Sequence, residues 1–188
     1  MTLVLASASP QRRDILTSLG VEFALRSADV VESDEGPPRA VARENALRKA
    51  LGVERAGGEV VLGVDTLVAT ELEIWGKPPT AAAAAETLRR LSGRVHEVVS
   101  GFALASDEGV IAGEEITLVT FRALDEATIA WYMATGEWEG RAGGYAIQGR
   151  GGALVRRIEG DYLNVVGLPL AALLEAGAPL GPGGEMSR

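Results

Sequence analysis

The segment from Leu3 to Leu19, LVLASASPQRRDILTSL, contains the signals of a strand, a tight turn and a helix in immediate succession. Its first residues, Leu3–Ala6, form a short apolar run that is typical of a buried parallel strand. Ser9 is of a type that caps helices, and Pro10 fits a first helical turn. Apolar side chains then recur at helical spacing, at Ile15, Leu16 and Leu19. A strand that leads directly into a helix predicts an α/β fold.

The rest of the chain continues this mixture of helical and extended patterns. Further helices are predicted over residues 40–55, 80–91, 125–133 and 169–176, with Thr80 and Asp125 as the caps of the second and third. Strands are predicted over residues 21–25, 59–64, 95–105 and 110–122, and hairpins over residues 67–75 and 154–166. The strand over residues 59–64 is expected to end at Asp65 and Thr66. Parallel and antiparallel strands together predict an α/β class fold with a mixed α+β sheet.

Length and composition predict one globular domain. The 188 residues are 47% hydrophobic, which is too apolar for a disordered chain and sufficient for a core. We expect a single domain over residues 1–177 and a flexible tail over residues 178–188. No apolar run approaches the about 18 residues of a membrane span. The N-terminus lacks the basic residues of a secretory signal, so we expect a cytoplasmic protein.

Residue counts and net charge exclude several kinds of site. The chain has no cysteine, which excludes disulfides, thiol nucleophiles and cysteine-bound zinc. His96 is the single histidine, so a histidine-cluster metal site is excluded, and a lone histidine is more often structural than catalytic. The net charge of −8 argues against a nonspecific nucleic-acid binder, but it permits a small anionic ligand in a local pocket.

Lysine and glutamine each occur only twice in this sequence. Of the 18 basic residues, only Lys49 and Lys77 are lysines, and Gln11 and Gln148 are the only glutamines. A composition bias toward arginine would leave lysine where a compact ammonium cannot be replaced by a planar guanidinium; chance is the alternative. The rare residues are therefore candidates for a functional site.

The turn and helix start over residues 7–13 are the first candidate site. A helix N-terminus offers free backbone N–H groups and a partial positive charge, which suit an anion. Ser7 and Ser9 add hydroxyl donors, and Arg12 adds a guanidinium that suits phosphate. The alternative is an ordinary capped helix with surface arginines. The Walker pattern is absent from the sequence, so a P-loop is excluded.

Carboxylates supply the second candidate site. Asp65 is expected at the carboxyl end of an apolar strand, where ligand sites of α/β sheets gather. A carboxylate there can bind a divalent metal or accept a proton from water, although a simple turn is the alternative. Glu32 lies in an acidic loop, where a solvated charge is the alternative.

Together these residues suit the cleavage of a phosphoanhydride, which requires charge neutralisation and an in-line nucleophile. Lys77 is held by two following prolines, and Lys49 lies in a predicted helix. Gln148 lies in a glycine-rich stretch that could approach a ligand and read a base edge. The set contains no activated serine, cysteine or histidine, which favours a metal-assisted attacking water.

The sequence resembles the Maf family of nucleoside triphosphate pyrophosphatases in eight blocks, which occur in family order between Leu3 and Ala176. The first, Ser7-Ala8-Ser9-Pro10-Gln11-Arg12, is similar to the family's Ser-x-Ser-Pro-x-Arg signature. The others are Glu32, the Lys-Ala element at Lys49, Gly63-Val64-Asp65-Thr66, Gly76-Lys77-Pro78, Leu91-Ser92-Gly93 with His96 and Val98, Gly144–Gly149 and Val166–Pro169. Each block alone is weak, but eight in order leave little room for coincidence.

The resemblance implies a Maf/ITPase-like fold, in which helices flank a twisted mixed sheet and a cleft separates two lobes. It implies hydrolysis of a nucleoside triphosphate to the monophosphate and pyrophosphate with a divalent cation, Mg²⁺ or Mn²⁺. Asp65 would accept the proton of the attacking water and hold the metal, assisted by Glu32. The residues implied to bind phosphate are Ser7, Ser9, Arg12, Lys49 and Lys77, of which the three cations also count as catalytic. Family analogy further implies a homodimer. From the net charge and the lack of a long apolar run, we expect no nucleic-acid or membrane partner.

Three positions bear on base preference. The branch of the family that prefers dTTP and UTP carries Arg after the proline, Asp-Thr and Ile-Gln-Gly, whereas the 7-methyl-GTP branch carries Trp, Asp-Gln and Ser-Glu-Gly. Thr66 and Gln148 match the dTTP/UTP branch, and Gln11 matches neither. We therefore expect a dTTP/UTP pyrophosphatase that cleans nucleotide pools. The alternatives are a 7-methyl-GTP pyrophosphatase and a nucleotide-binding regulator of septum formation.

Overall fold

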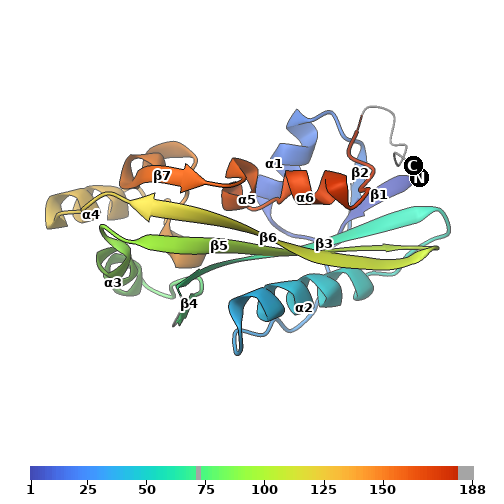
Figure 1. Ribbon diagram of the computed structural model, residues 1–188, viewed down its shortest axis with the longest axis horizontal. Coiled ribbons are helices and arrows are strands. Elements are labelled where there is room, and N and C mark those ends of the chain that lie inside the picture. Colours follow the sequence, from blue (N-terminus) through green and yellow to red (C-terminus); the bar gives the residue numbers. More distant parts are fainter. Residues whose placement is uncertain (71–72, 182–188) are drawn as a thin grey trace. The chain divides into compact units, whose positions relative to one another are not determined.

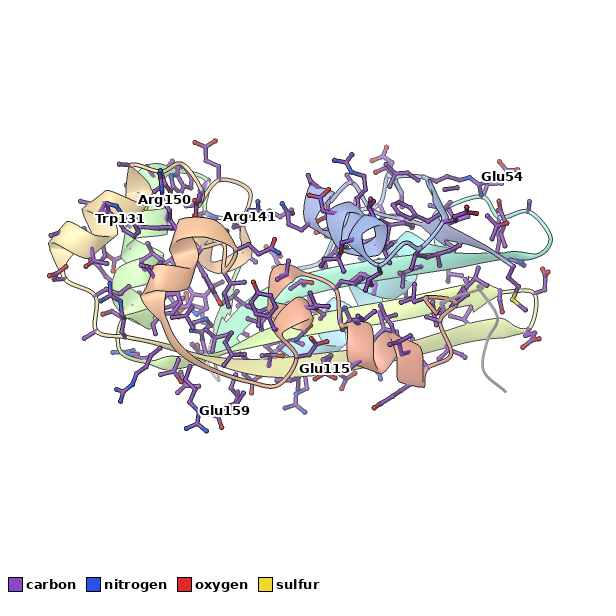
Figure 2. All side chains as sticks on the ribbon, turned by 90° about the horizontal axis from the view of Figure 1, so that it is seen from above. Glu54, Glu115, Trp131, Arg141, Arg150 and Glu159 are labelled. Carbon is purple, nitrogen blue, oxygen red and sulfur yellow. The ribbon has the colours of Figure 1, made fainter. Side chains whose placement is uncertain are left out.

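A computed structural model describes residues 1–70 and 73–181, and these residues gather into two compact units (Figure 1). Unit 1 comprises residues 1–66, 100–115 and 167–181. Unit 2 comprises residues 67–70, 73–99 and 116–166. Exposed carboxylates point into solvent from both, such as Glu54 of unit 1 and Glu159 of unit 2 (Figure 2).

The strands form one seven-stranded mixed sheet in the order β2-β1-β3-β5-β6-β7, with β4 paired to β3. The strands are β1 (Thr2–Leu5), β2 (Phe23–Leu25), β3 (Glu59–Thr70), β4 (Glu73–Trp75), β5 (Val95–Ser106), β6 (Gly109–Phe121) and β7 (Val155–Glu159). β1 pairs in parallel with β2 and β3, whereas β4 and β7 pair antiparallel with β3 and β6. The predicted mixed α/β fold is therefore confirmed.

Unit 1 begins with the predicted strand, turn and helix. β1 leads into α1 (Pro10–Ser18), and the parallel strands β1, β2 and β3 alternate with α1 and α2 (Pro38–Leu51). α2 covers one face of these strands, and α1 and α6 (Leu170–Glu175) cover the opposite face (Figure 1). The core between α2 and the strands is built from small side chains, including Val4, Ala6, Ala50, Val61, Ala103 and Ala105.

Two glycines of the sheet bring α2 unusually close to the strands. A Cβ atom on Gly63 of β3 would lie 2.1 Å from the carbonyl oxygen of Ala46, and one on Gly101 would lie 2.2 Å from that of Ala42. Both distances are far below van der Waals contact, so only glycine fits at these two positions. The α2 backbone therefore rests directly on the sheet, and the polar side chains of the same helix reach β3.

Unit 2 has a core that is richer in aromatic side chains. It contains α3 (Ala81–Leu91), α4 (Glu126–Met133), two 3₁₀ turns (Ala142–Gly144 and Gly149–Leu154) and α5 (Tyr162–Val166). Thr80 and Asp125 cap α3 and α4 as predicted, since each side chain accepts a hydrogen bond from the first turn. The buried core residues are Val68, Leu88, Leu91, Val98, Val119, Phe121, Ile129, Tyr132, Tyr145, Ile147 and Leu154.

Two predictions of secondary structure are wrong. β3 does not end at Val64 but continues to Thr70, so Asp65 and Thr66 lie within the strand. The second arm predicted for the hairpin over residues 154–166 is the helix α5, and β7 pairs with β6 instead. The Asp161 carboxylate accepts a hydrogen bond from the Leu163 N–H at 2.7 Å, which is a contact typical of a helix start.

No helix within residues 1–70 and 73–181 has the length and apolar character needed to cross a membrane. At the end of the described chain, Ala178 and Leu180 are buried in unit 1. Most of the predicted flexible tail, residues 182–188, lies outside the described residues. Both that tail and the single domain over residues 1–177 stay predictions.

Candidate active site

Asp65 forms the centre of a buried polar network in unit 1. Its carboxylate is 5% exposed, and its two oxygens have different partners. Oδ1 lies 2.7 Å from the Lys49 Nζ, and Oδ2 accepts a hydrogen bond from the Asn45 Nδ2 at 3.0 Å. The Lys49 ammonium also lies 2.8 Å from the Glu32 Oε1. The three charged residues that the sequence singled out here, Glu32, Lys49 and Asp65, are therefore brought together.

Two consecutive elements explain why these groups meet. Asn45 and Lys49 are one helical turn apart on α2, so they lie on the same face of the helix. Both are buried, which places them on the face that rests on the sheet. Asp65 lies two residues after Gly63 on β3, on the same face of the strand as the glycine that admits the helix. The close approach of α2 therefore delivers the ammonium and the amide to the carboxylate.

A second set of contacts converges on Arg12, which is buried. Its Nε donates to the Gly167 carbonyl oxygen at 2.8 Å, Nη1 to the Ser7 Oγ at 2.9 Å and Nη2 to the Thr66 Oγ1 at 3.1 Å. Burial lowers the pKa of the guanidinium, and the negative charges of Asp65 and Glu32 oppose that shift. Arg12 therefore ties α1, β3 and the segment before α6 together beside the acidic pair.

The Ser9 hydroxyl does not make the contact that the sequence predicts. Ser9 occupies the N-cap position of α1, but its side chain does not cap the helix. Its Oγ instead donates to the Gln11 Oε1 at 3.1 Å, and its backbone N–H donates to the Ser7 Oγ at 3.2 Å. The capping expected of Ser9 is therefore wrong, because Gln11 takes its hydroxyl.

Thr66 has a hydroxyl partner that the sequence did not single out. Its Oγ1 lies 2.8 Å from the Oγ of Ser100, which is fully buried on β5. The Arg12 guanidinium donates to the same Thr66 oxygen. The side chain predicted to read the base is therefore held by protein groups on two sides.

Asn45 is the second residue of the network that sequence reasoning missed. It is 1% exposed, and its amide contacts both the backbone of Ser33 and the Asp65 carboxylate. The available signal was its position four residues before Lys49 in a helical pattern, because Asn is unfavourable inside helices unless a contact requires it. The predicted site in unit 1 is thus larger than the charged residues alone.

The remaining predicted residues, Lys77 and Gln148, belong to unit 2, and both are exposed. The segments that carry them lie side by side, since the Gly143 N–H donates to the Gly76 carbonyl oxygen at 3.1 Å. Gly143 has a φ of 67°, which favours glycine in this tight approach. Their joining with the residues of unit 1 in one site stays a prediction.

His96 has the environment of a core residue. It is 1% exposed, its Nε2 lies 2.9 Å from the Tyr145 hydroxyl, and its ring packs edge-on against Phe121 and Tyr145. Burial lowers the pKa of His96 to about 4, so the ring is neutral at pH 7. This geometry agrees with a structural rather than a catalytic histidine.

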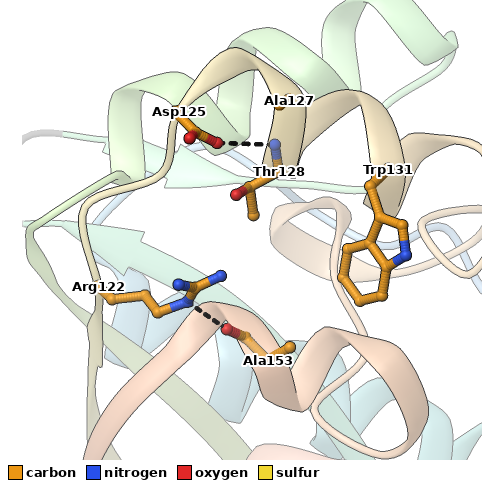
Figure 3. Close-up of a pocket in the computed structure, with 6 residues that line it drawn as sticks. All are labelled: Arg122, Asp125, Ala127, Thr128, Trp131 and Ala153. Carbon is orange, nitrogen blue, oxygen red and sulfur yellow. Dashed lines mark hydrogen bonds between the residues drawn. The ribbon is translucent and has the colours of Figure 1, made fainter.

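A shallow pocket of about 390 Å³ lies in unit 2 beside α4 (Figure 3). It is lined by Arg122, Asp125, Ala127, Thr128, Trp131 and Ala153, and the Arg122 Nε donates to the Ala153 carbonyl oxygen. Trp131 is 46% exposed at its rim. None of the residues predicted from the sequence for the functional site lines this pocket.

The carboxylates of unit 1 fit a divalent cation of the magnesium type. Mg²⁺ is usually bound through one or two carboxylates together with substrate phosphates and water, rather than by an all-protein cage. Glu32 and Asp65 each direct one oxygen at the same ammonium, so the two carboxylates converge. Among the described residues, no group of three or more His, Cys, Asp or Glu side chains could hold a metal. The two converging carboxylates are thus donors of the kind that Mg²⁺ uses together with substrate phosphates and water.

Comparison with known proteins gives consistent results. The family model described as Maf-like protein matches residues 2–177. A dTTP/UTP pyrophosphatase of Moorella thermoacetica is 48% identical over 92% of this chain and 92% of its own. Proteins of the same name from Symbiobacterium thermophilum and Pyrococcus furiosus are 44% and 40% identical, over 97% and 92% of both chains. A model that matches nearly the whole chain, with relatives of this identity, shows the family: this protein belongs to the Maf family.

Proposed function

We propose that this protein hydrolyses dTTP and UTP to the nucleoside monophosphate and pyrophosphate. The observation that carries the proposal is the buried Asp65 carboxylate, which Lys49 and Asn45 hold in one orientation beside Glu32 and Arg12. The relatives named above are called dTTP/UTP pyrophosphatases, and they match this chain almost from end to end. This similarity favours pyrophosphate release over the alternative of a nucleotide-binding regulator.

In the proposed reaction, a water oxygen attacks the α-phosphorus and the bond to the bridging oxygen of pyrophosphate breaks. Asp65 orients the water and accepts its proton, which a carboxylate inside a polar network can do. Lys49 and Arg12 offset the negative charge that grows on the leaving pyrophosphate, with Lys77 acting from unit 2. Ser7 and Ser9 donate hydroxyl hydrogen bonds to phosphate oxygens.

Lys49 has two tasks in this proposal. In the structure its ammonium is the counter-ion of both Asp65 and Glu32. A divalent cation, Mg²⁺ or Mn²⁺, would be held by the same two carboxylates and would neutralise phosphate charge when bound. The ammonium would then be available for the phosphates, where its compact charge is suitable.

Base preference is assigned to Thr66 and Gln148. Thr66 has its hydroxyl fixed by Arg12 and Ser100, so it presents one orientation to a ligand. The exposed Gln148 carries a carboxamide that can both donate to and accept from a pyrimidine edge. Gln11 is held by Ser9, and its effect on base choice is part of the test. We further propose a cytoplasmic protein that acts as a homodimer.

A product panel tests the proposal. The protein is incubated with dTTP, UTP, CTP or 7-methyl-GTP and with Mg²⁺ or Mn²⁺, and pyrophosphate is resolved from orthophosphate. Pyrophosphate from dTTP and UTP, abolished by a chelator, is the expected result. A preference for 7-methyl-GTP would overturn the assignment of the base, and tight binding without turnover would favour the regulator.

A further inference from the structure

Asn45 is a buried amide that makes three hydrogen bonds to two parts of unit 1. Its Oδ1 accepts from the Ser33 backbone N–H at 2.8 Å. Its Nδ2 donates to the Ser33 carbonyl oxygen at 2.8 Å and to the Asp65 Oδ2 at 3.0 Å. One side chain of α2 therefore connects the acidic loop to the carboxylate on β3.

The partners fix which way the amide points. The Ser33 carbonyl and the Asp65 carboxylate can only accept hydrogen bonds, and the Ser33 N–H can only donate. The opposite orientation would place the amide oxygen against two oxygens and its NH₂ against an N–H. All of its contacts are thus satisfied in one orientation only, so replacement by any side chain without both donor and acceptor breaks the connection.

The connection also controls the spacing of the two acids. Ser33 directly follows Glu32 in the sequence. The two hydrogen bonds to the Ser33 backbone therefore anchor the loop next to Glu32. The third bond holds the Asp65 oxygen that Lys49 does not contact. Asn45 thus holds the backbone beside Glu32 and one carboxylate oxygen of Asp65.

We propose that Asn45 is a positioning residue, which sets the placement of Glu32 and Asp65 for the reaction by connecting the acidic loop to β3. The role rests on the proposed function, because it acts through Asp65. Asn45 contacts no substrate in this scheme. It holds the carboxylate that takes the proton and limits the movement of its acidic neighbour.

Two variants test this role. Asn45→Leu removes all three hydrogen bonds at similar volume. The isosteric Asn45→Asp keeps the acceptor for the Ser33 N–H but removes the donors to the Ser33 carbonyl oxygen and to Asp65. We expect each to lower kcat for dTTP about 10–100-fold, the usual cost of losing such a supporting contact, with KM within about threefold. Thermal unfolding followed by circular dichroism establishes that each variant is folded.

The matched control is Asn164→Leu. Asn164 is the only other asparagine of the chain and is fully buried in unit 2, where its amide donates to the Val98 carbonyl oxygen and the Thr117 hydroxyl. This variant loses a buried amide of the same kind. We expect it to lower the unfolding temperature but to leave kcat within about threefold of the wild type.

A double-mutant cycle separates positioning from general damage. If Asn45 acts through Asp65, adding Asn45→Leu to Asp65→Asn should lower kcat by less than about threefold further. Independent losses that multiply would overturn the proposal. Wild-type kcat in folded Asn45→Leu and Asn45→Asp would overturn it as well.

Amide hydrogen exchange provides a readout that needs no substrate. The Ser33 N–H should be protected in the wild type and should exchange about tenfold or more faster in Asn45→Leu. Unchanged exchange at Ser33 in that variant would contradict the anchoring of the loop. If the wild type releases no pyrophosphate, the proposed function fails, whereas the exchange result still decides whether Asn45 anchors the loop.

Discussion

Unit 1 and unit 2 bury polar groups in opposite ways. In unit 1 the buried polar side chains include the charged Arg12, Lys49 and Asp65, within an aliphatic core that is rich in alanine, valine and leucine. In unit 2 the buried polar side chains Thr87, His96, Thr117 and Asn164 are all uncharged at neutral pH, within an apolar core that contains aromatic side chains. Burying charge is costly even when it is paired, so such a concentration in one unit requires a reason other than stability.

This difference indicates that buried side chains have separate roles in the two units, catalysis in unit 1 and stability in unit 2. The charged side chains of unit 1 are held by one another and by Asn45, which fixes their orientation at the expense of apolar packing. Unit 2 uses aromatic packing around His96, which is the cheaper way to stabilise a fold. Functional sites are where proteins accept such local cost, and this favours unit 1 as the location of the reactive carboxylate.

The two lysines are expected to show the largest difference between the units. Lys49→Met would leave the Asp65 and Glu32 carboxylates without their shared cation, and we expect a loss of about 3–5 kcal/mol in unfolding free energy. Lys77→Met, at an exposed position of unit 2, should change it by less than about 0.5 kcal/mol. Both variants should lose activity. Urea unfolding and pyrophosphate release measure the two effects. Equal losses of unfolding free energy in the two variants would contradict the difference between the units.

His96 allows a pH test of unit 2. Its folded-state pKa of about 4 lies below its ordinary value of 6.5, so the unfolded chain takes up the proton first as the pH falls. The stability that the neutral ring contributes is complete above pH 6.5 and is lost toward pH 4, by about 3 kcal/mol. The measurement compares unfolding free energies of the wild type and His96→Phe at both pH values. If the unfolding free energies of wild type and His96→Phe depended on pH in the same way, the His96 ring would not be buried in its neutral form.

Gly63 tests the approach of α2 to the sheet. In Gly63→Ala the new methyl group meets the Ala46 carbonyl oxygen, and overpacking of this kind costs about 1–3 kcal/mol. We expect a lower unfolding temperature together with a lower kcat, because the displaced helix carries Asn45 and Lys49. Gly57→Ala is the control, since nothing lies within 4 Å of a Cβ atom there. Full activity in Gly63→Ala would show that the site does not depend on this contact.

The smallest effect is expected at the pocket of unit 2. Trp131 is half-exposed at the rim, so Trp131→Ala should change the unfolding free energy by no more than about 0.5 kcal/mol and leave pyrophosphate release unchanged. Thermal unfolding and the product assay check this. A large loss of activity would assign a function to this surface and weaken the contrast between the units.

Most elements were predictable because their local signals agree with the fold. The strand, turn and helix at the N-terminus and the caps Thr80 and Asp125 are examples. The sequence misled where tertiary contacts decide. Asp65 reads as a strand end because an isolated carboxylate would be costly inside a sheet, but Asn45 and Lys49 satisfy it there.

The candidate site was predictable in its charged members and not in its supporting ones. Lys49 stands out by rarity, and Asp65 stands out as a carboxylate after an apolar run. The importance of Asn45 and Ser100 comes from distant partners on other elements, which the sequence does not show. The β-branched Val165 and Val166 favoured a strand over residues 162–166, whereas the contact of Asp161 with Leu163 starts a helix.

We expect the buried Asp65 to serve the reaction rather than the stability of unit 1. The most direct measurement determines, for wild type and Asp65→Asn, both pyrophosphate release from dTTP and the free energy of unfolding. Asn keeps the shape of the side chain, and Lys49 keeps Glu32 as a partner. We predict that kcat falls by about 10²–10⁴-fold, the typical contribution of general acid–base catalysis, while the variant stays folded. Near-normal turnover by folded Asp65→Asn would contradict a role of Asp65 in the reaction.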